Sequence, residues 1–282
     1  MKKLVKLLVV LLACVCAVSL VACKKTELTK LEQIQKQGYI TIAVSPDYAP
    51  FEFVNTSVGD DAYVGSDIEF MKYIAKELGV ELKIQAVDFD STLSLLAAGS
   101  VDMSVSAFTY KESRAEIYDF TDMYFDEGGQ VILVPASCTY TTLAELANEQ
   151  LGGQSASLQY DFISKYVYGA AGVDKTPTSF SLIADGVNLM KAGQLYGIAL
   201  AEPVAQALVE SSKDSEGNPL YKIFEVKLPV PAEQTQLYAL CQKSTDKSLL
   251  NKVNEIIAKM VEEDVYEGWF EAAQELQGQL NA

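Results

Sequence analysis

The chain has 282 residues, of which 49% are hydrophobic and 21% charged, a composition typical of a globular protein with one large or two medium domains. Its formal net charge of −16 argues against nucleic acid as a partner, because an acidic surface repels phosphate backbones. Histidine is absent, which excludes Ser-His and Cys-His catalysis and histidine-ligated zinc, although carboxylates alone could still perform acid–base chemistry.

The first 22 residues have the features of a secretory signal peptide. Three lysines precede an apolar run from Leu7 to Leu20, and small residues follow it. Leu20-Val21-Ala22-Cys23 resembles the bacterial lipobox, which implies lipidation of Cys23 and a short tether over residues 23–30. The alternative is an uncleaved membrane helix, but the run is shorter than the roughly 20 residues that such a helix needs. Cleavage would leave 260 residues and, without the three lysines, change the formal charge from −16 to −19.

After residue 30, short apolar runs alternate with helical patterns of about ten to fifteen residues, which predicts an α/β protein with largely parallel sheets. Strands are expected at 39–44, 80–87, 101–106, 151–155, 195–200 and 236–240. Helices are expected from Ser66 or Asp67 to Leu78, from Asp90 or Ser91 to Gly99, from Thr141 or Thr142 to Ala147, and at 158–168, 182–192, 202–212, 248–263 and 265–274.

Two proline-containing segments, 134–137 and 227–231, each follow an apolar strand and are interpreted as crossings between compact units. They predict two lobes joined twice. The first lobe would comprise residues 31–134 and 228–282, and the second residues 135–227. A cleft is expected between them.

Arg114 is the only arginine among 22 basic residues. A guanidinium offers parallel N–H donors that hold a carboxylate or phosphate in two places, whereas lysine supplies a point charge. The predicted start of a helix at Lys111 or Glu112 would add backbone N–H groups and a positive dipole. The alternative is an arginine retained by chance in an exposed ion pair.

Two cysteines, Cys138 and Cys241, remain once Cys14 and Cys16 leave with the signal peptide and Cys23 carries lipid. They are too few and too far apart in sequence to suggest a metal cluster, so no metal or cofactor is expected. They could pair, but we interpret them as two small buried residues.

Three groups of residues carry a resemblance to a known family. They are the run from Ile42 to Phe53 (IAVSPDYAPFEF), Val64-Gly65-Ser66-Asp67-Ile68-Glu69, and the segment from Ser106 to Arg114 with Asp119-Phe120-Thr121. In order and spacing they resemble the solute-binding proteins that feed amino-acid ABC transporters, over residues 31–270. The resemblance implies the two-lobed type II periplasmic-binding-protein fold, an extracytoplasmic lipid-anchored receptor, an ABC permease as partner, and binding of an amino acid or similar carboxylate without catalysis.

The resemblance also implies the ligand contacts in the first lobe. Arg114 would bind the ligand α-carboxylate with help from Thr109, Ser106 and Ala107. Tyr48 and Phe89 fall where the family places aromatic walls beside the ligand side chain. Ser45 stands where some relatives that bind cationic ligands carry an acid.

In the second lobe, Gln154 and Ser157 belong to a loop, 154–159, in which the family makes further contacts to the carboxylate; Leu158 stands where a second hydroxyl is common. The family acid that receives the α-ammonium would fall at Ala201, which has no charge to offer. Glu202, its neighbour, either takes that role or only caps the following helix.

Two other functions remain open at this point. Exported dehydratases of cyclohexadienyl substrates share the fold, and Asp47, Glu52 or Glu202 could serve as their acid. A sensor or adhesin that uses the two lobes as a scaffold is the other alternative.

Overall fold

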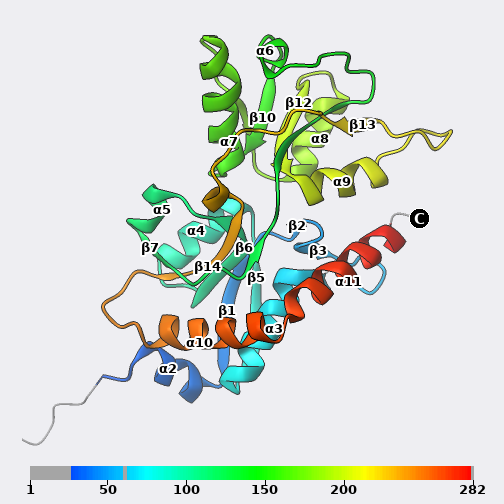
Figure 1. Cartoon of the computed structure of the whole chain (residues 1–282). Helices are drawn as coiled ribbons and strands as arrows, with labels where there is room; N and C mark the ends of the chain where they lie inside the picture. The colour runs from blue at the N-terminus through cyan, green and yellow to red at the C-terminus, as the bar shows by residue number, and fades with distance from the viewer. Residues whose placement is uncertain (1–26, 60–61, 281–282) are drawn as a thin grey trace, which may run out of the picture.

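The structure is a computed structural model that describes residues 27–59 and 62–280. The predicted signal peptide and Cys23 lie outside the described residues. The chain forms two α/β lobes, each built on its own sheet and joined by two crossings (Figure 1).

The sheet of the first lobe has the strand order β5-β1-β6-β14-β7, with β8 also paired to β14. β1 lies parallel to β5 and β6, while β14 runs antiparallel to β6 and brings the end of the chain back into this sheet, as predicted. The bounds are β1 (Tyr39–Val44), β5 (Glu81–Ala86), β6 (Met103–Thr109), β7 (Tyr118–Phe120), β8 (Phe125–Asp126) and β14 (Gln236–Gln242). A small antiparallel sheet beside it contains β2 (Asp47–Tyr48), β3 (Glu52–Val54) and β4 (Tyr63–Val64).

The second sheet has the order β11-β10-β12-β9-β13, with β10 parallel to β11 and β12, and β9 antiparallel to β12 and β13. Its strands are β9 (Gln130–Pro135), β10 (Leu151–Gln154), β11 (Thr178–Phe180), β12 (Gly197–Ala201) and β13 (Tyr221–Ile223). β9 therefore belongs to the second lobe, so the predicted lobe boundary at residue 134 is wrong. The apolar run of β9 is buried against its neighbours in this sheet, and the chain crosses before Gln130.

The second crossing also differs from the prediction of 227–231. Leu228 donates its N–H to Gln130 O and packs, with Val230, in the apolar cluster of the second lobe. The chain therefore leaves this lobe after Val230, through the short 3-10 helix η2 (Ala232–Gln234). The two crossings lie side by side, because Glu127 N–H donates to Thr235 O at 2.9 Å.

Helices flank both sheets. The first lobe carries α2 (Lys30–Gln37), α3 (Ser66–Leu78), α4 (Phe89–Ala97), α5 (Glu112–Ala115), α10 (Ser248–Glu262) and α11 (Val265–Leu280). The second carries α6 (Leu143–Leu146), α7 (Leu158–Phe162) continued by the π-helix η1 (Ile163–Gly169), α8 (Ile183–Lys191) and α9 (Glu202–Ser211). α11 packs against α3 and also against α9 of the second lobe (Figure 1).

Two predicted helix starts need correction. α3 is preceded by Gly65, without a side-chain cap, and both Ser66 and Asp67 are buried inside the helix instead of capping it. α4 is capped by Asp88, whose carboxylate accepts from Ser91 N–H at 3.1 Å, so Phe89 becomes its first residue. Propensity identifies these helices, but the neighbouring chain decides which polar residue faces the helix end.

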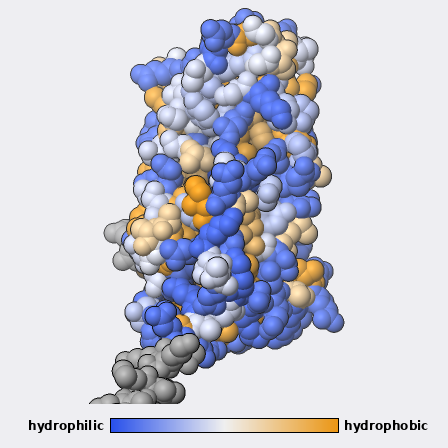
Figure 2. Space-filling model, turned by 90° about the vertical axis from the view of Figure 1, so that its left-hand side faces the viewer, coloured by the Kyte–Doolittle hydropathy of each residue, from blue (hydrophilic) through white to orange (hydrophobic). Residues whose placement is uncertain are grey.

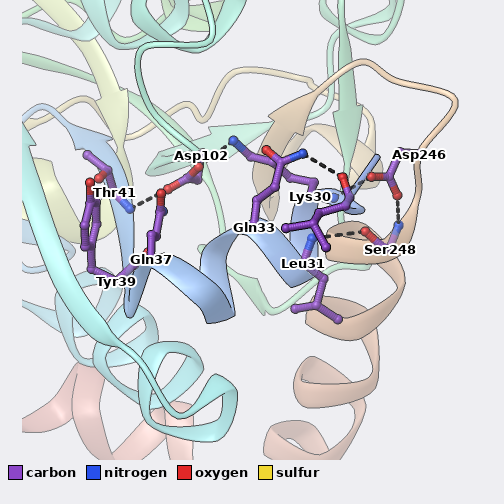
Figure 3. A network of polar contacts seen from close by, with 10 residues as sticks. Lys30, Leu31, Gln33, Gln37, Tyr39, Thr41, Asp102, Asp246 and Ser248 are labelled. Atoms are coloured by element: carbon purple, nitrogen blue, oxygen red, sulfur yellow. Dashed lines mark hydrogen bonds and ion pairs between the residues drawn. The ribbon is translucent and has the colours of Figure 1, made fainter. Parts of the chain in front are cut away.

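The beginning of the described chain is fixed to the base of the first lobe (Figure 3). Lys30 pairs with Asp102 at 2.6 Å, and Asp102 also accepts from Thr41 N–H of β1 at 2.7 Å. Lys30 N–H donates to Asp246, and the adjacent Leu31 N–H donates to Ser248 at the start of α10. The last residue of the predicted tether and the residue after it are therefore held by the start of α10 and, through Asp102, by β1.

The surface drawn in Figure 2 is largely hydrophilic, with apolar residues scattered over it. Among residues 27–59 and 62–280, no helix has the length and apolarity to cross a membrane. Cys138 lies in the apolar cluster of the second lobe and Cys241 in β14 of the first, and both are free and buried. This confirms the interpretation of two small buried residues.

Candidate functional site

A cavity lies between the two lobes, with about 430 Å³ of unfilled space including the part that opens to solvent. The first lobe contributes the ends of β1 and β6, the small sheet, and the starts of α4 and α5. The second lobe contributes the loop after β10, the starts of α7 and α8, and β12. The lining residues are Ser45, Asp47, Tyr48, Glu52, Phe89, Ser106, Ala107, Thr109, Arg114, Gln154, Ser157, Leu158, Gln159, Ile183, Ala199 and Leu200.

Arg114 lines this cavity and is only 5% exposed. Its Nη1 donates to Thr109 O at 3.2 Å, and its Nη2 donates across the cleft to Ala156 O at 2.6 Å. Its Nε is buried and has no hydrogen-bond partner among the described residues. Burial lowers the pKa of the guanidinium to about 10, so it remains a cation at neutral pH. The group thus presents a positive charge and unused N–H donors to the cavity.

The end of β6 brings three predicted contacts to the cavity. Ser106 Oγ donates to Glu52 Oε1 at 2.7 Å and accepts from Ser45 N–H at 3.0 Å. Ala107 has a left-handed backbone, with φ of 45°, and its N–H donates to the buried Asp67 at 2.9 Å. Buried Thr109 supplies the carbonyl that orients Arg114. Predicted residues Ser45, Ser106, Ala107 and Thr109 therefore lie together beside Arg114.

The predicted anion site at a helix start is weaker than expected. α5 spans only Glu112–Ala115, a single turn, so the aligned peptide dipoles that would create a positive helix end are few. Lys111, before α5, instead pairs across the cleft with Asp161 of α7 at 2.6 Å. The positive charge at this end of the cavity is therefore that of Arg114.

The two predicted aromatic walls both line the cavity. Phe89 packs against Phe108 with ring centroids 5.0 Å apart and ring planes tilted by 37°, and the guanidinium carbon of Arg114 lies 5.5 and 5.4 Å from the two ring centroids. Tyr48 crosses to the second lobe, where its hydroxyl accepts from Ala201 N–H at 3.0 Å. Tyr48 is thus also a direct contact between the lobes.

The predicted second-lobe residues Gln154 and Ser157 line the cavity as well. Ser157 caps α7 by accepting from Tyr160 N–H, and Gln154 Nε2 donates to Ser181 O at 3.0 Å. Ala156, with φ of 62°, directs its carbonyl to Arg114. The loop after β10 therefore forms the wall opposite Arg114.

Glu202 is the predicted site residue that does not line the cavity. It is the first residue of α9, and its carboxylate pairs with Lys227 at 2.5 Å with 38% of the side chain exposed. The cavity wall at this position is formed by β12 residues Ala199 and Leu200.

Seven cavity residues were not among the predicted ligand contacts: the polar Asp47, Glu52 and Gln159, and the apolar Leu158, Ile183, Ala199 and Leu200. Asp47 and Glu52 belong to the run that carries the family resemblance, and they were considered only as acids for an enzyme. Gln159 falls within the second-lobe loop, so its place in the cavity could have been read from the same alignment. Ile183 is the first residue of α8, whose start the sequence predicted, but no sequence signal indicated that this helix begins at the cavity.

Glu52 is a buried carboxyl whose Oε2 has no hydrogen-bond partner that the described atoms supply. Burial and the nearby charge of Asp67 raise its pKa well above the ordinary value of 4.5. Asp67 is itself held by Tyr124, Tyr266 and the Ala107 N–H. Because three donors stabilise the charge of Asp67 whereas Glu52 accepts from Ser106 alone, we assign Glu52 as the neutral acid of this pair.

Comparison with known proteins places this geometry in a family. The chain is 24% identical over 250 residues to the L-cystine-binding protein TcyJ of Escherichia coli (strain K12), covering 86% of each chain. It is 27% identical over 180 residues to the arginine-binding extracellular protein ArtP of Bacillus subtilis (strain 168), covering 63% of this chain and 67% of that one.

A crystal structure of an amino acid ABC transporter substrate-binding protein from Streptococcus pneumoniae Canada MDR_19A, bound to L-arginine, superposes with a TM-score of 0.77 at 27% identity, covering 88% of this chain and 98% of that one. The model for bacterial extracellular solute-binding proteins, family 3, matches residues 40–272, which include both lobes and every cavity-lining residue. The chain therefore belongs to family 3 of the bacterial extracellular solute-binding proteins.

Proposed function

We propose that this protein captures an amino acid, or a similar small solute with a carboxylate, in the interlobe cavity and delivers it to an ABC permease. The observation that carries the proposal is Arg114: a sole guanidinium, buried in a cavity between two lobes, with an unused Nε–H donor. Such a group favours a ligand carboxylate strongly, because charge-assisted hydrogen bonds gain strength where water is excluded. Relatives described as binding arginine or cystine support the same class of ligand.

The residues around Arg114 have defined roles in this proposal. Arg114, Ser106, Ala107 and Thr109 hold the carboxylate from the first lobe, and Ser157 with Gln154 approaches from the second. Tyr48 and Phe89 flank the remainder of the ligand. Because a ligand that touches both lobes stabilises the closed form relative to the open one, closure becomes the signal that the permease reads.

The proposal assigns binding and not catalysis to the cavity. Glu52 is hydrogen-bonded to Ser106 and lies against Asp67, so this carboxyl is engaged with the protein, while the hydrogen bonds that Asp47 accepts favour its charged form, which has no proton to donate to a leaving group. Incubation with prephenate or arogenate is expected to give no dehydrated product; turnover would favour the enzyme alternative.

The proposal further places the protein on the extracytoplasmic face of the membrane, held there by lipid on Cys23. The apolar run before Cys23 and its lipobox-like end support the anchor. The contacts of Lys30 and Leu31 with the base of the first lobe would then connect the tether to a fixed point of the fold (Figure 3).

The test of this function is the affinity of Arg114→Lys for L-arginine, L-cystine and L-glutamine, measured by calorimetry. The change keeps the positive charge but removes the planar guanidinium. We expect the variant to bind at least about tenfold more weakly than the wild type, which corresponds to a loss of about 1.4 kcal/mol in binding free energy. Lys72→Arg, on the exposed face of α3, is the matched control and is expected to bind as the wild type does. An unchanged affinity for Arg114→Lys would show that the side chain of Arg114 does not contact the ligand.

A further inference from the structure

Asp47 is a carboxylate that faces the same cavity as Arg114. Its Oδ1 accepts from Ser45 Oγ at 2.9 Å, and its Oδ2 accepts from Ile183 N–H at 2.8 Å and, more weakly, from Gln154 Nε2 at 3.4 Å. All three donors are neutral groups. Within residues 27–59 and 62–280, no lysine or arginine lies at ion-pair distance from it. Asp47 is thus a carboxyl group in the cavity that the described residues leave without a cationic partner.

The other acids near the cavity do not compete for that role. Glu52 is held neutral, because burial and Asp67 raise its pKa. Glu202 is turned outward to Lys227. Burial raises the pKa of Asp47 above its ordinary value of 3.8, but hydrogen bonds from Ile183, Ser45 and Gln154 to the charged form act against that rise, whereas the pKa of Glu52 is raised well above 4.5 by burial and Asp67. It is therefore the cavity carboxylate best supported as an anion.

The second lobe offers no acidic side chain at the end of β12 that could bind a cation in place of Asp47. Residue 201 is alanine, and its N–H is already donated to the hydroxyl of Tyr48. The neighbouring wall consists of Ala199 and Leu200, which are apolar. A cationic group in this cavity therefore has to be met from the first lobe, where Asp47 stands beside Tyr48 in β2.

We infer that Asp47 binds the cationic nitrogen of the ligand while Arg114 binds its carboxylate. The inference rests on the proposed function and narrows its ligands to solutes that carry both charges. A carboxylate accepts about four hydrogen bonds, so Oδ1 keeps capacity for a further donor beside Ser45. Because Oδ2 already holds the first N–H of α8 in the second lobe, the same side chain couples the cation to the contact between the lobes.

The cationic nitrogen could be an α-ammonium or a side-chain cation, and matched ligands separate the two. L-Arginine and L-glutamine are compared with their deaminated forms, 5-guanidinopentanoate and 4-carbamoylbutanoate, to measure the preference for the α-ammonium. L-Arginine is compared with L-citrulline to measure the preference for the guanidinium. Calorimetry on the folded chain without its signal peptide gives each affinity for the wild type and for Asp47→Asn.

In at least one pair, the wild type is expected to bind the ligand that carries the tested cationic group roughly tenfold or more tightly than the ligand that lacks it, and Asp47→Asn is expected to lose most of that preference. The affinity of Asp47→Asn for the ligand that lacks the tested group is expected to stay within about threefold of the wild-type value, which shows that the cavity is intact. Asp47→Ser serves as a second variant if Asp47→Asn does not fold. Glu202→Gln, outside the cavity, is the matched control and is expected to keep the wild-type preference.

The inference is overturned if Asp47→Asn and Asp47→Ser keep every preference of the wild type, or if the wild type shows no preference for the cation. Neither result would contradict the proposal that the cavity binds a carboxylate, provided that Arg114→Lys still weakens binding. Wild-type protein that binds none of these probes would instead contradict the proposed function itself.

Discussion

Glu127 is a buried carboxyl at the crossing between the lobes, and it stands at one end of a chain of side chains that reaches the cavity. It accepts from Gln130 Nε2 at 2.6 Å, and Gln130 accepts from Gln159 Nε2 at 3.0 Å. Its second oxygen has no partner within the described residues. Burial raises the pKa of Glu127 well above 4.5, and the charges of Asp67 and Asp126 act in the same direction.

The raised pKa of Glu127 predicts a pH-dependent stability. The folded state binds this proton more tightly than the unfolded chain, so the stabilisation is complete below about pH 4.5 and decreases as the pH rises toward the folded-state pKa. Glu127→Gln keeps an acceptor for Gln130 and carries no charge. The melting temperature of Glu127→Gln minus that of the wild type is therefore expected to increase between pH 4.5 and pH 8.

Thermal melts over that range measure the effect. Asp126→Asn removes a carboxylate from the adjacent exposed position and is the matched control, for which the difference in melting temperature is expected to change less. A difference for Glu127→Gln that stays constant with pH would mean that Glu127 is ionised in the folded protein.

At the scale of single residues, the sequence identified Arg114 and the neutral polar groups around it, but it did not identify Asp47 as a ligand contact. Arg114 was found because it is the only arginine, a signal that needs no structure. Asp47 could not be found in that way, because its importance depends on α8 of the second lobe meeting β2 across the cleft. Glu202 was considered a contact because it adjoins Ala201, but the start of α9 directs it toward Lys227 instead.

Among the elements, α3 depends on a glycine before its first residue. Gly65 has φ of 122°, and a Cβ there would lie 2.2 Å from Phe51 O, a backbone atom. Gly65→Ala is therefore expected to destabilise the protein by about 2 kcal/mol or more, because the backbone of β3 would have to move. Chemical denaturation measures the free energy of unfolding.

Gly268 in α11 is the matched control for that substitution. A Cβ at Gly268 meets nothing within 4 Å, and the residue is exposed in the first turn of the helix. Gly268→Ala is expected to stabilise the protein by about 0.5 to 1 kcal/mol, since alanine is the better helix former. Equal effects of the two alanine substitutions would contradict the close approach of α3 to β3.

Periodicity predicted most elements within a few residues, because apolar residues at helical or strand spacing report a buried face. β1 matches its predicted bounds, and α9 ends one residue early. The errors concern positions that distant contacts decide. Gly65 precedes α3 where Ser66 or Asp67 was expected to cap it, and β9 joins the second sheet although its proline resembled the end of the first lobe.

For the whole molecule, direct contacts across the cleft hold the lobes together. Lys111 pairs with Asp161, Arg114 donates to Ala156 O, and Tyr48 accepts from Ala201 N–H. The Lys111–Asp161 pair is partly exposed, so its contribution is about 1 kcal/mol or less.

Asp161→Asn is therefore expected to shift the population toward open lobes and to weaken ligand binding by up to about fivefold, without a comparable loss of stability. Small-angle scattering of the free and ligand-bound protein measures the opening, and calorimetry measures the affinity. Glu69→Gln, which breaks a pair on the exposed face of α3, is the control. An identical affinity for Asp161→Asn would mean that this pair does not influence closure.

The proposed anchor is tested in the producing cell. Cys23→Ser removes the thiol that would carry lipid, so the protein is expected to leave the membrane fraction while its purified form keeps wild-type ligand affinity. Fractionation followed by calorimetry checks both parts. Cys138→Ser, a buried cysteine in the second lobe, is the control and should stay with the membrane. A Cys23→Ser protein that remains membrane-bound would exclude lipid on Cys23 as the anchor.

The central claim is that the guanidinium of Arg114 binds the carboxylate of a small solute between the lobes. Its most direct test compares, by calorimetry, the L-amino acid that binds most tightly with the corresponding amide, which keeps the ammonium and side chain but lacks the negative charge. We predict that the amide binds to the wild type at least about tenfold more weakly than the acid, and that this difference largely disappears in Arg114→Gln, which removes the positive charge. Equal binding of the acid and the amide by the wild type would contradict the claim.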